Sequence, residues 1–267
     1  MDRRRVYVAL VFFPLFYLLV RHLPEAAFTV FVAAGILLAQ YEYYRFHFPE
    51  PMSLPIGLGL GLGLLVTAGF AAPGLLPAHA TVSAIVGAVL LSQLWSGREP
   101  KSGLMDTAVV GFGVFYLAWL LGHMIALRQF TEGPFLIFFL FLVTWANDTG
   151  AYYVGTFWGR RPLAPRISPR KTWEGTVGGL FGSVLAALAC RAWFLDSLST
   201  GEALGAGVLI GLAAPLGDLA ESILKRSAGV KDSGSILPGH GGLLDRIDSL
   251  IFTTPAFYYY LLAVRTP

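Results

Sequence analysis

Acidic and basic side chains gather in one stretch of the chain, residues 217–248, with the sequence GDLAESILKRSAGVKDSGSILPGHGGLLDRID. It contains His240, five acidic residues and four basic ones (Asp218, Glu221, Asp232, Asp245, Asp248; Lys225, Arg226, Lys231, Arg246). Carboxylates bind hard cations such as Mg²⁺, whereas lysine and arginine bind phosphate. This mixture is what phosphoryl or nucleotidyl transfer requires, and Asp218, Asp245 and Asp248 suit Mg²⁺.

The first part of the stretch is expected to be the end of a helix. Helical spacing of i, i+3, i+4 and i+7 would place four polar side chains on one face (Asp218, Glu221, Ser222 and Lys225). Pro215 would kink this helix just before the polar face. The spacing therefore predicts an acidic helix end directed toward one site.

A tight, glycine-rich loop follows, and Asp245 and Asp248 then open the next helix on a shared face. Acidic residues at a helix start also suit the helix dipole, which is the simpler explanation of these two. The dipole does not account for Arg246 between them or for the acidic face on the preceding helix. We therefore expect both aspartates to belong to the site.

Two further segments carry polar residues in unusual places. Asn147 and Asp148 lie inside a long apolar run, where a carboxylate is costly unless it is paired or bound to a metal. The simpler alternative for such a residue is a hydrogen bond between helices. In the loop 160–175, Ser168 or Thr172 could cap the next helix. Lys171 would then lie beside the N-terminus of that helix. That arrangement would bind an anion, although basic residues in such loops also serve membrane orientation.

The composition indicates what must position these residues. Of 267 residues, 55% are hydrophobic and 13% charged, against about 25% charged in soluble domains. Nine apolar runs can be counted, with eight or ten as alternatives (about 6–23, 25–46, 54–72, 79–96, 104–127, 133–158, 173–194, 202–224 and 243–264). The prediction is an all-α, polytopic membrane protein. We expect a helical scaffold over 1–130, with possible lipid-tail contacts, and a catalytic region over 131–267.

Charge placement predicts orientation. With nine spans, most lysines and arginines fall on the side of the N-terminus, which the positive-inside rule assigns to the cytoplasm. The first apolar run could mimic a signal peptide, but it lacks a small-residue cleavage motif, so we expect it to be retained. The net charge of +3 shows no nucleic-acid signature, and the single Cys190 excludes an internal disulfide.

More than a dozen positions of the polar stretch follow the pattern Ser222-x-Leu224-Lys225-Arg226-x4-Lys231-Asp232-x5-Pro238-x-His240-Gly241-Gly242-x2-Asp245-Arg246-x-Asp248. This pattern resembles the signature of phosphatidate cytidylyltransferases, also called CDP-diacylglycerol synthases. Two further family segments are similar to Asn147-Asp148-x-Gly150-Ala151-Tyr152 and Ser168-Pro169-Arg170-Lys171-Thr172-Trp173-Glu174-Gly175. Arg170 stands where lysine is commoner. The specific resemblance covers about 140–255.

The resemblance implies that CTP and phosphatidic acid react to give CDP-diacylglycerol and pyrophosphate. It implies Mg²⁺, with or without a second cation, and a homodimer. We expect the protein in a prokaryotic plasma (inner) membrane, and the positive-inside rule predicts that its site lies on the cytoplasmic side. Asp218 and Asp245, then Asp248, would bind the metal. Phosphates would be held by basic side chains (Lys171, Lys225, Arg226, Lys231 and Arg246). Asn147, Asp148 and Ser168 would shape the nucleotide site, and Asp232 would lie beside it. His240 would contact a phosphate, orient a carboxylate, or serve only the glycine turn.

Two other classes of protein also fit parts of the pattern. A transporter or proton channel would have charged residues and a proline-broken helix, but its acidic residues would follow a path across the membrane. The second alternative is another membrane lipid-phosphate enzyme, such as a CDP-alcohol phosphotransferase or a CTP-dependent lipid kinase. A CDP-alcohol phosphotransferase would carry a D-G-x2-A-R pattern, which this sequence lacks.

Overall fold

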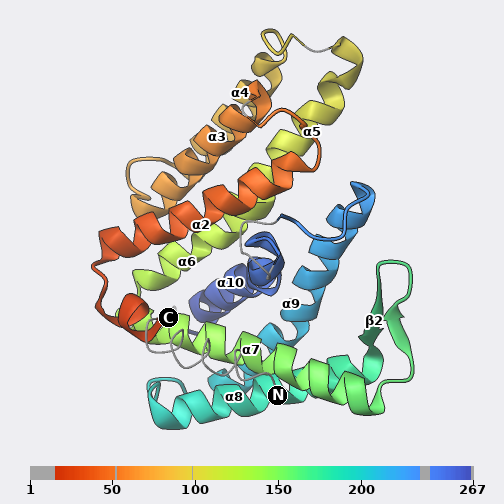
Figure 1. Ribbon diagram of the computed structural model, residues 1–267. Coiled ribbons are helices and arrows are strands. Elements are labelled where there is room, and N and C mark those ends of the chain that lie inside the picture. The colour runs from red at the N-terminus through yellow and green to blue at the C-terminus, as the bar shows by residue number, and fades with distance from the viewer. Residues whose placement is uncertain (1–15, 52, 98, 235–240, 266–267) are drawn as a thin grey trace.

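The computed structural model describes residues 16–51, 53–97, 99–234 and 241–265 (Figure 1). Its regular structure is helical apart from one β-hairpin, which confirms the all-α class. In chain order the elements are α2 (Glu25–Arg45), α3 (Leu54–Ala71), α4 (Ala78–Ser92), η1 (Pro100–Ser102), α5 (Gly103–Gly113), the π-helical η2 (Val114–Trp119), α6 (Leu120–Arg128), α7 (Gly133–Trp158), β1 (Pro162–Ala164), β2 (Ser168–Thr172), α8 (Trp173–Trp193), α9 (Thr200–Ser227) and α10 (Leu244–Arg265).

Seven helical segments among the described residues are long and apolar enough to cross a membrane (Glu25–Arg45, Leu54–Ala71, Pro100–Arg128, Gly133–Trp158, Trp173–Trp193, Thr200–Ser227 and Leu244–Arg265). The predicted fourth span corresponds to α4, which has only 15 residues, fewer than the roughly 20 needed to span a bilayer. Most of the predicted first span lies outside the described residues, although 16–22 are helical. The protein is therefore a polytopic helical membrane protein, while the count of nine spans and the cytoplasmic N-terminus stay predictions.

Helix α10 runs through the middle of the assembly (Figure 1). It packs against α9, α6, α7 and α2, and its Ile251, Phe257 and Leu261 side chains are buried. Because α10 begins with the acidic stretch of the sequence, this central position brings groups from both halves of the chain to its first turn.

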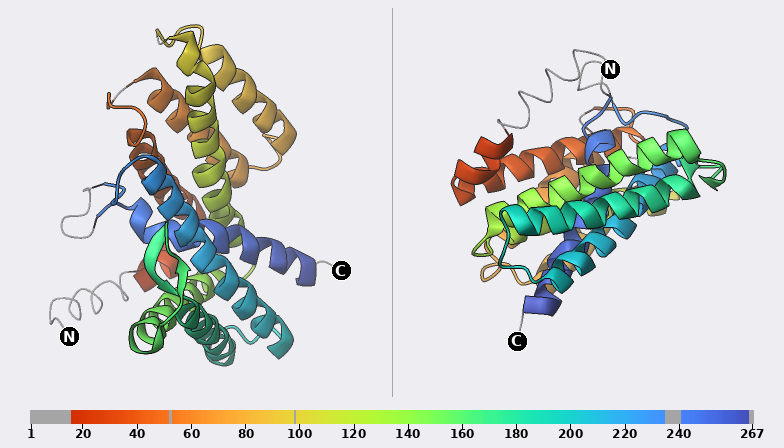
Figure 2. Two further views of the ribbon diagram at one scale, coloured as in Figure 1. Left: turned by 90° about the vertical axis from the view of Figure 1, so that its right-hand side faces the viewer. Right: turned by 90° about the horizontal axis from the view of Figure 1, so that it is seen from below.

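Helices α7 and α8 lie side by side, as the right-hand view in Figure 2, which shows the molecule from below, makes clear. Their backbones approach closely at glycine. A Cβ atom on Gly150 would lie 2.6 Å from the carbonyl oxygen of Gly178, and one on Gly179 would lie 2.9 Å from the carbonyl oxygen of Asn147. Small residues of this kind allow close packing of membrane helices. The contact fixes α7, and with it Asp148, against the start of α8.

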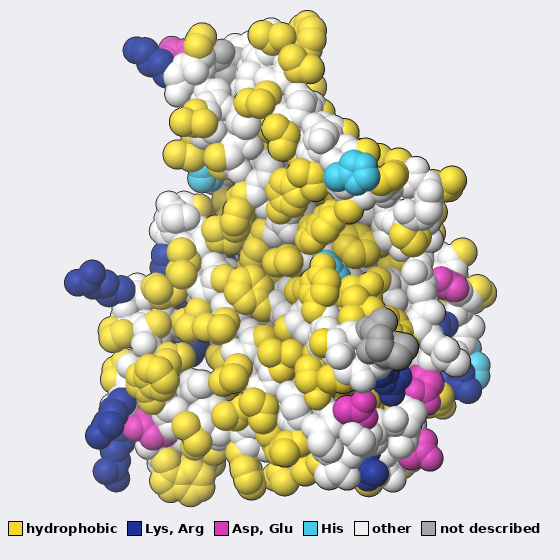
Figure 3. Space-filling model, turned by 180° about the vertical axis from the view of Figure 1, so that it is seen from behind, with side chains coloured by type: hydrophobic (Ala, Val, Ile, Leu, Met, Phe, Trp, Pro, Cys, Tyr) yellow, Lys and Arg dark blue, Asp and Glu magenta, His cyan; other side chains and the backbone are white. Residues whose placement is uncertain are grey.

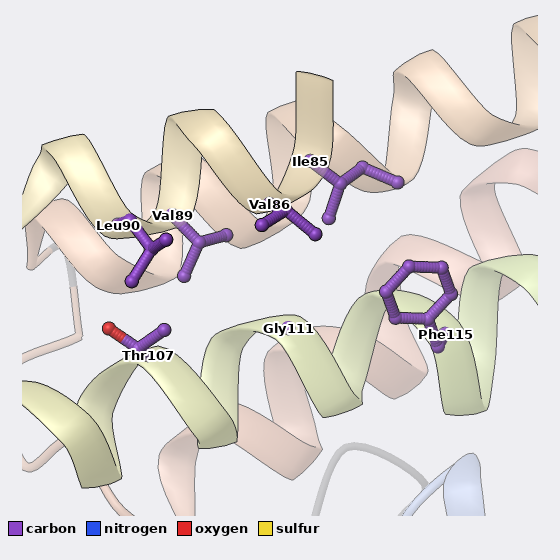
Figure 4. A pocket seen from close by; sticks show the side chains of 7 residues that line it. All are labelled: Ile85, Val86, Val89, Leu90, Thr107, Gly111 and Phe115. Atoms are coloured by element: carbon purple, nitrogen blue, oxygen red, sulfur yellow. The ribbon is translucent and has the colours of Figure 1, made fainter. Parts of the chain in front are cut away.

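The molecular surface agrees with a membrane location. Figure 3 shows hydrophobic side chains over much of one face, with charged side chains gathered toward its margins. Large apolar side chains such as Leu104 and Trp193 are at least 80% exposed. An apolar pocket lies between α4 and the continuous segment α5–η2 (Figure 4), lined by Ile85, Val86, Val89, Leu90, Thr107, Gly111 and Phe115. Its lining includes no charged residue, so the polar chemistry must lie elsewhere.

The segment expected to be an irregular loop, 160–175, contains a short antiparallel hairpin. Pro162 in β1 pairs with Thr172 in β2, and Ala164 pairs with Ser168. The Glu174 carboxylate accepts hydrogen bonds from the backbone N–H groups of Arg160 (3.0 Å) and Arg161 (3.2 Å). These two bonds tie the base of the hairpin to the first turn of α8. The prediction missed the hairpin because prolines and arginines obscure any strand-like alternation.

Candidate active site

The polar end of α9 is helical as predicted, and Pro215 lies inside the helix just before it. Along this face the Ser222 hydroxyl donates to Asp218 Oδ1 at 3.4 Å. One turn further on, Lys225 Nζ lies 2.7 Å from Glu221 Oε2. The predicted i, i+4 relationships therefore exist, and they divide the face into two groups of side chains.

The first group, which we call the Asp218 cluster, consists of Asp148, Lys171, Asp218 and Asp248. Lys171 Nζ lies 2.6 Å from Asp218 Oδ2, and both side chains remain partly exposed. Asp248 experiences the negative charges of both Asp218 and Asp148, and the positive charge of Lys171. Four separate elements (α7, β2, α9 and α10) thus bring three carboxylates and one lysine together.

Within the part of the chain that the structure describes, few hydrogen-bond donors contact the carboxylates of the Asp218 cluster. Asp248 Oδ1 accepts from the backbone N–H of its neighbour Ser249 at 2.6 Å, and the Ser249 side chain also interacts with Asp148. Among the described residues, the contacts of the Asp218 carboxylate are the ion pair with Lys171 and the long contact from Ser222. Three negative charges near one positive charge leave this cluster with a surplus of negative charge, which favours binding of a cation.

The second group, the Asp245 cluster, consists of Glu42, Glu221, Lys225, Ser233 and Asp245. Lys225 Nζ lies 2.6 Å from Asp245 Oδ1 as well as contacting Glu221, whose side chain is 1% exposed. Asp245 Oδ2 accepts from the Ser233 N–H (3.0 Å), the Ser233 hydroxyl (2.9 Å) and the Gly242 N–H (3.0 Å). Both oxygens of Asp245 are therefore engaged within the protein.

Glu42 in α2 was not predicted as a site residue. Its side chain is 2% exposed and accepts hydrogen bonds from the backbone N–H groups of Leu243 (3.0 Å) and Leu244 (2.8 Å). The Ser233 hydroxyl lies 3.3 Å from its Oε2 atom. The sequence did contain a signal, because Glu42 is an acidic residue within the second apolar run, and such residues are rare in spans without a role.

Asn147 is placed differently from the other predicted site residues. It is buried, and its side-chain amide donates to the Ser183 hydroxyl (3.0 Å) and to the Gly211 carbonyl (3.1 Å). These bonds join α7 to α8 and α9, which is the helix–helix alternative considered for this residue. Asn147 therefore stabilises the packing that holds Asp148.

The remaining predicted residues that the structure describes are partly or fully exposed. Ser168 begins β2 and is partly exposed, whereas the side chains of Arg226, Lys231, Asp232 and Arg246 are exposed. The Arg226 guanidinium donates to the Val230 carbonyl at 3.1 Å. Thr172, not Ser168, caps α8, since its hydroxyl accepts from the Gly175 N–H at 3.1 Å. His240 lies outside the described residues.

Within the described part of the chain, no group of three or more His, Cys, Asp or Glu side chains has the geometry to hold a metal ion by itself. Mg²⁺ in nucleotide sites is commonly held by one or two protein carboxylates together with substrate phosphates. The sparsely bonded carboxylates of Asp218 and Asp248 fit that partial donor set. Asp245 would have to release Lys225 or a backbone donor to join it.

A family model described as the cytidylyltransferase family matches residues 3–264 of the chain. Among curated proteins, the uncharacterised protein YnbB of Escherichia coli K12 is 47% identical over 150 residues, which is 56% of this chain and 49% of that protein. A phosphatidate cytidylyltransferase of Staphylococcus aureus is 44% identical over 156 residues, covering 58% of this chain and 59% of that enzyme.

A third similar protein is a phosphatidate cytidylyltransferase of Haemophilus influenzae, 41% identical over 142 residues, which is 50% of this chain and 49% of that enzyme. These alignments span about half to three-fifths of the relatives' lengths. The family model, in contrast, extends over nearly the whole chain.

Proposed function

Because the chain belongs to the cytidylyltransferase family, we propose that it is a membrane nucleotidyltransferase that converts CTP and phosphatidic acid to CDP-diacylglycerol and pyrophosphate. The observation that carries this proposal is the Asp218 cluster, in which three carboxylates and one lysine from four elements meet and have few other partners among the described residues. The names of the similar proteins of Staphylococcus aureus and Haemophilus influenzae support the choice of substrates.

In the proposed reaction, a phosphate oxygen of phosphatidic acid attacks the α-phosphorus of CTP. A P–O bond forms there, the bond from the α-phosphorus to the bridging oxygen of the β-phosphate breaks, and its electron pair leaves on pyrophosphate. Both substrates are anions, so catalysis depends on positioning and on positive charge near the phosphates. Lys171 is proposed to bind a CTP phosphate, with Arg226, Lys231 and Arg246 around it.

The donor set of the Asp218 cluster supports Mg²⁺ as the metal. Asp218 and Asp248 would hold it, Asp148 and Ser168 would shape the nucleotide side of the site, and a second cation remains compatible with three carboxylates. When bound, Mg²⁺ would neutralise charge on the phosphates. Asp245 and Lys225 already form an ion pair with each other, with Lys225 Nζ 2.6 Å from Asp245 Oδ1. The expected metal-binding role of Asp245 and the expected phosphate-binding role of Lys225 therefore stay predictions.

We place the site on the cytoplasmic side of a bacterial plasma (inner) membrane. The support is the positive-inside pattern, in which the hairpin residues Arg160, Arg161, Arg166 and Arg170 are all exposed. The similar curated proteins are bacterial. A homodimer is proposed from the family resemblance alone, and chemical cross-linking in native membranes tests it.

The test is an assay of purified protein in detergent with labelled CTP, phosphatidic acid and Mg²⁺. We expect Mg²⁺-dependent formation of CDP-diacylglycerol that is lost in Asp218→Asn. It should be kept in Asp196→Asn, which changes an exposed aspartate between α8 and α9. If the protein makes no product while an active control enzyme does so in the same detergent, the proposed function is wrong.

A further inference from the structure

Glu42 is the one member of either cluster that comes from the first half of the chain. It projects from α2 to the start of α10. There it contacts Leu243 and Leu244, which lie 201 and 202 residues further along the chain. The backbone N–H groups at a helix start lack partners within the helix and carry partial positive charge. The Glu42 carboxylate satisfies two of them at the start of α10, so α2 supplies part of the N-terminal cap of α10.

The loop before α10 is shaped around this carboxylate. A Cβ atom on Gly234 would lie 2.9 Å from Glu42 Oε1, and one on Gly242 would lie 2.7 Å from Glu42 Oε2. Glycine at both positions therefore lets the backbone approach the carboxylate from two sides, where a side chain would press against it. Displacing Glu42 would leave this backbone without the group that it surrounds.

Ser233 connects Glu42 to Asp245. Its hydroxyl lies 3.3 Å from Glu42 Oε2 and 2.9 Å from Asp245 Oδ2. A hydroxyl has one proton to donate, so the two carboxylates share a single donor. The position of Glu42 is thereby transmitted to Asp245, which holds Lys225, and along the first turn of α10 to Asp248.

A purely structural cap would not need a charged residue. Serine or asparagine caps helices without the cost of burying a charge, and no ion pair to Glu42 occurs among the described residues. We propose that Glu42 is a positioning residue for the transferase reaction, which orients Asp245 and Asp248 through Ser233 and the start of α10. This inference rests on the proposed function.

The test compares Glu42→Ala and Glu42→Gln with Glu50→Ala, which removes an exposed glutamate just beyond the same end of α2. We expect kcat to fall about 10–100-fold in Glu42→Ala, the range seen when groups that orient catalytic ligands are lost. The KM for CTP should change by less than about twofold, because Lys171 and Asp218 do not contact Glu42. Glu42→Gln keeps one acceptor oxygen, so it should retain intermediate activity, and Glu50→Ala should match the wild type.

A double-mutant cycle identifies the route. If Glu42 acts through Ser233, the effects of Glu42→Gln and Ser233→Ala on kcat will be less than additive. Additive effects would overturn the route through Ser233, and wild-type kcat in folded Glu42→Ala would overturn the positioning role altogether.

Amide hydrogen exchange separates this inference from the proposed function. Exchange at Leu243 and Leu244 should become at least about tenfold faster in Glu42→Gln, because both N–H groups lose part of their acceptor. Unchanged exchange would contradict the inference even if the wild type were active. An inactive wild type with faster exchange in the variant would instead reject the transferase function and leave Glu42 only as a cap.

Discussion

The two carboxylate clusters share two helices, yet they differ in how their charges are satisfied. Each takes one acidic side chain from α9 and one from α10: Asp218 with Asp248, and Glu221 with Asp245. Each also contains three carboxylates and one lysine. Formal charge therefore does not distinguish the clusters, and the number of hydrogen-bond donors does.

In the Asp245 cluster, four backbone N–H groups and one hydroxyl point at Asp245 and Glu42. In the Asp218 cluster, the described residues offer one backbone donor, the Ser249 N–H, and two side-chain contacts, from Ser222 and Ser249. Carboxylates that are saturated with donors stabilise the fold, whereas carboxylates that repel one another cost stability and keep their capacity to bind a cation. The comparison predicts that substitutions in the two clusters will separate activity from stability.

The largest expected effect is on activity in the Asp218 cluster. Asp218→Asn should lower kcat/KM about 10³-fold, since losing several kcal/mol of charge stabilisation costs a factor of ten for each 1.4 kcal/mol or so. The melting temperature in detergent should stay the same or rise, because a repulsive charge is removed. Assays with labelled CTP and thermal unfolding test both. A large fall in melting temperature would remove the distinction between the clusters.

Asp245→Asn should give a different pattern. Breaking a largely buried ion pair while its partner remains costs roughly 3 kcal/mol, so the melting temperature should fall by several degrees. Activity should fall as well, because Lys225 and the loop lose their common partner. Thermal unfolding in the same detergent tests whether Asp245→Asn, unlike Asp218→Asn, lowers the melting temperature. A loss of activity with unchanged stability would place Asp245 with the metal ligands, as the sequence suggested.

The two lysines provide a matched pair. Lys225→Met leaves the buried Glu221 without its cation, so it should lower the melting temperature by several degrees. Lys171→Met should hardly change it, because Lys171 and Asp218 are 23% and 34% exposed. Instead, it should raise the KM for CTP about tenfold if Lys171 binds a phosphate. An equal loss of stability in both variants would contradict the comparison.

The smallest effects are expected at two serines. Ser233→Ala removes a buried hydroxyl placed between two carboxylates and should cost about 1–2 kcal/mol of unfolding free energy. Ser222→Ala removes only the long 3.4 Å contact to Asp218 and should change stability by less than about 0.5 kcal/mol. Denaturation in the same detergent measures the difference, and a reversed order would show that donor count does not govern these clusters.

Much of the fold could be predicted because a bilayer imposes simple rules. A helix is the form in which a single chain segment satisfies its own backbone groups in lipid, so the apolar runs define helices to within a few residues. The predicted run 133–158 is α7 with the same bounds. The hairpin at 162–172 was not predicted, because it lies outside the apolar runs, where no such rule applies.

The sequence by itself determined the helices, the polar face of α9 and the acidic start of α10, since each follows from composition or from the period of a single helix. The tertiary structure decided which charges have partners. Lys171 pairs with Asp218, Asn147 joins three helices, and Glu42 reaches across 202 residues to cap α10. Such pairings depend on how helices far apart in the sequence pack against one another. The residue pattern within one helix carries no information about that packing.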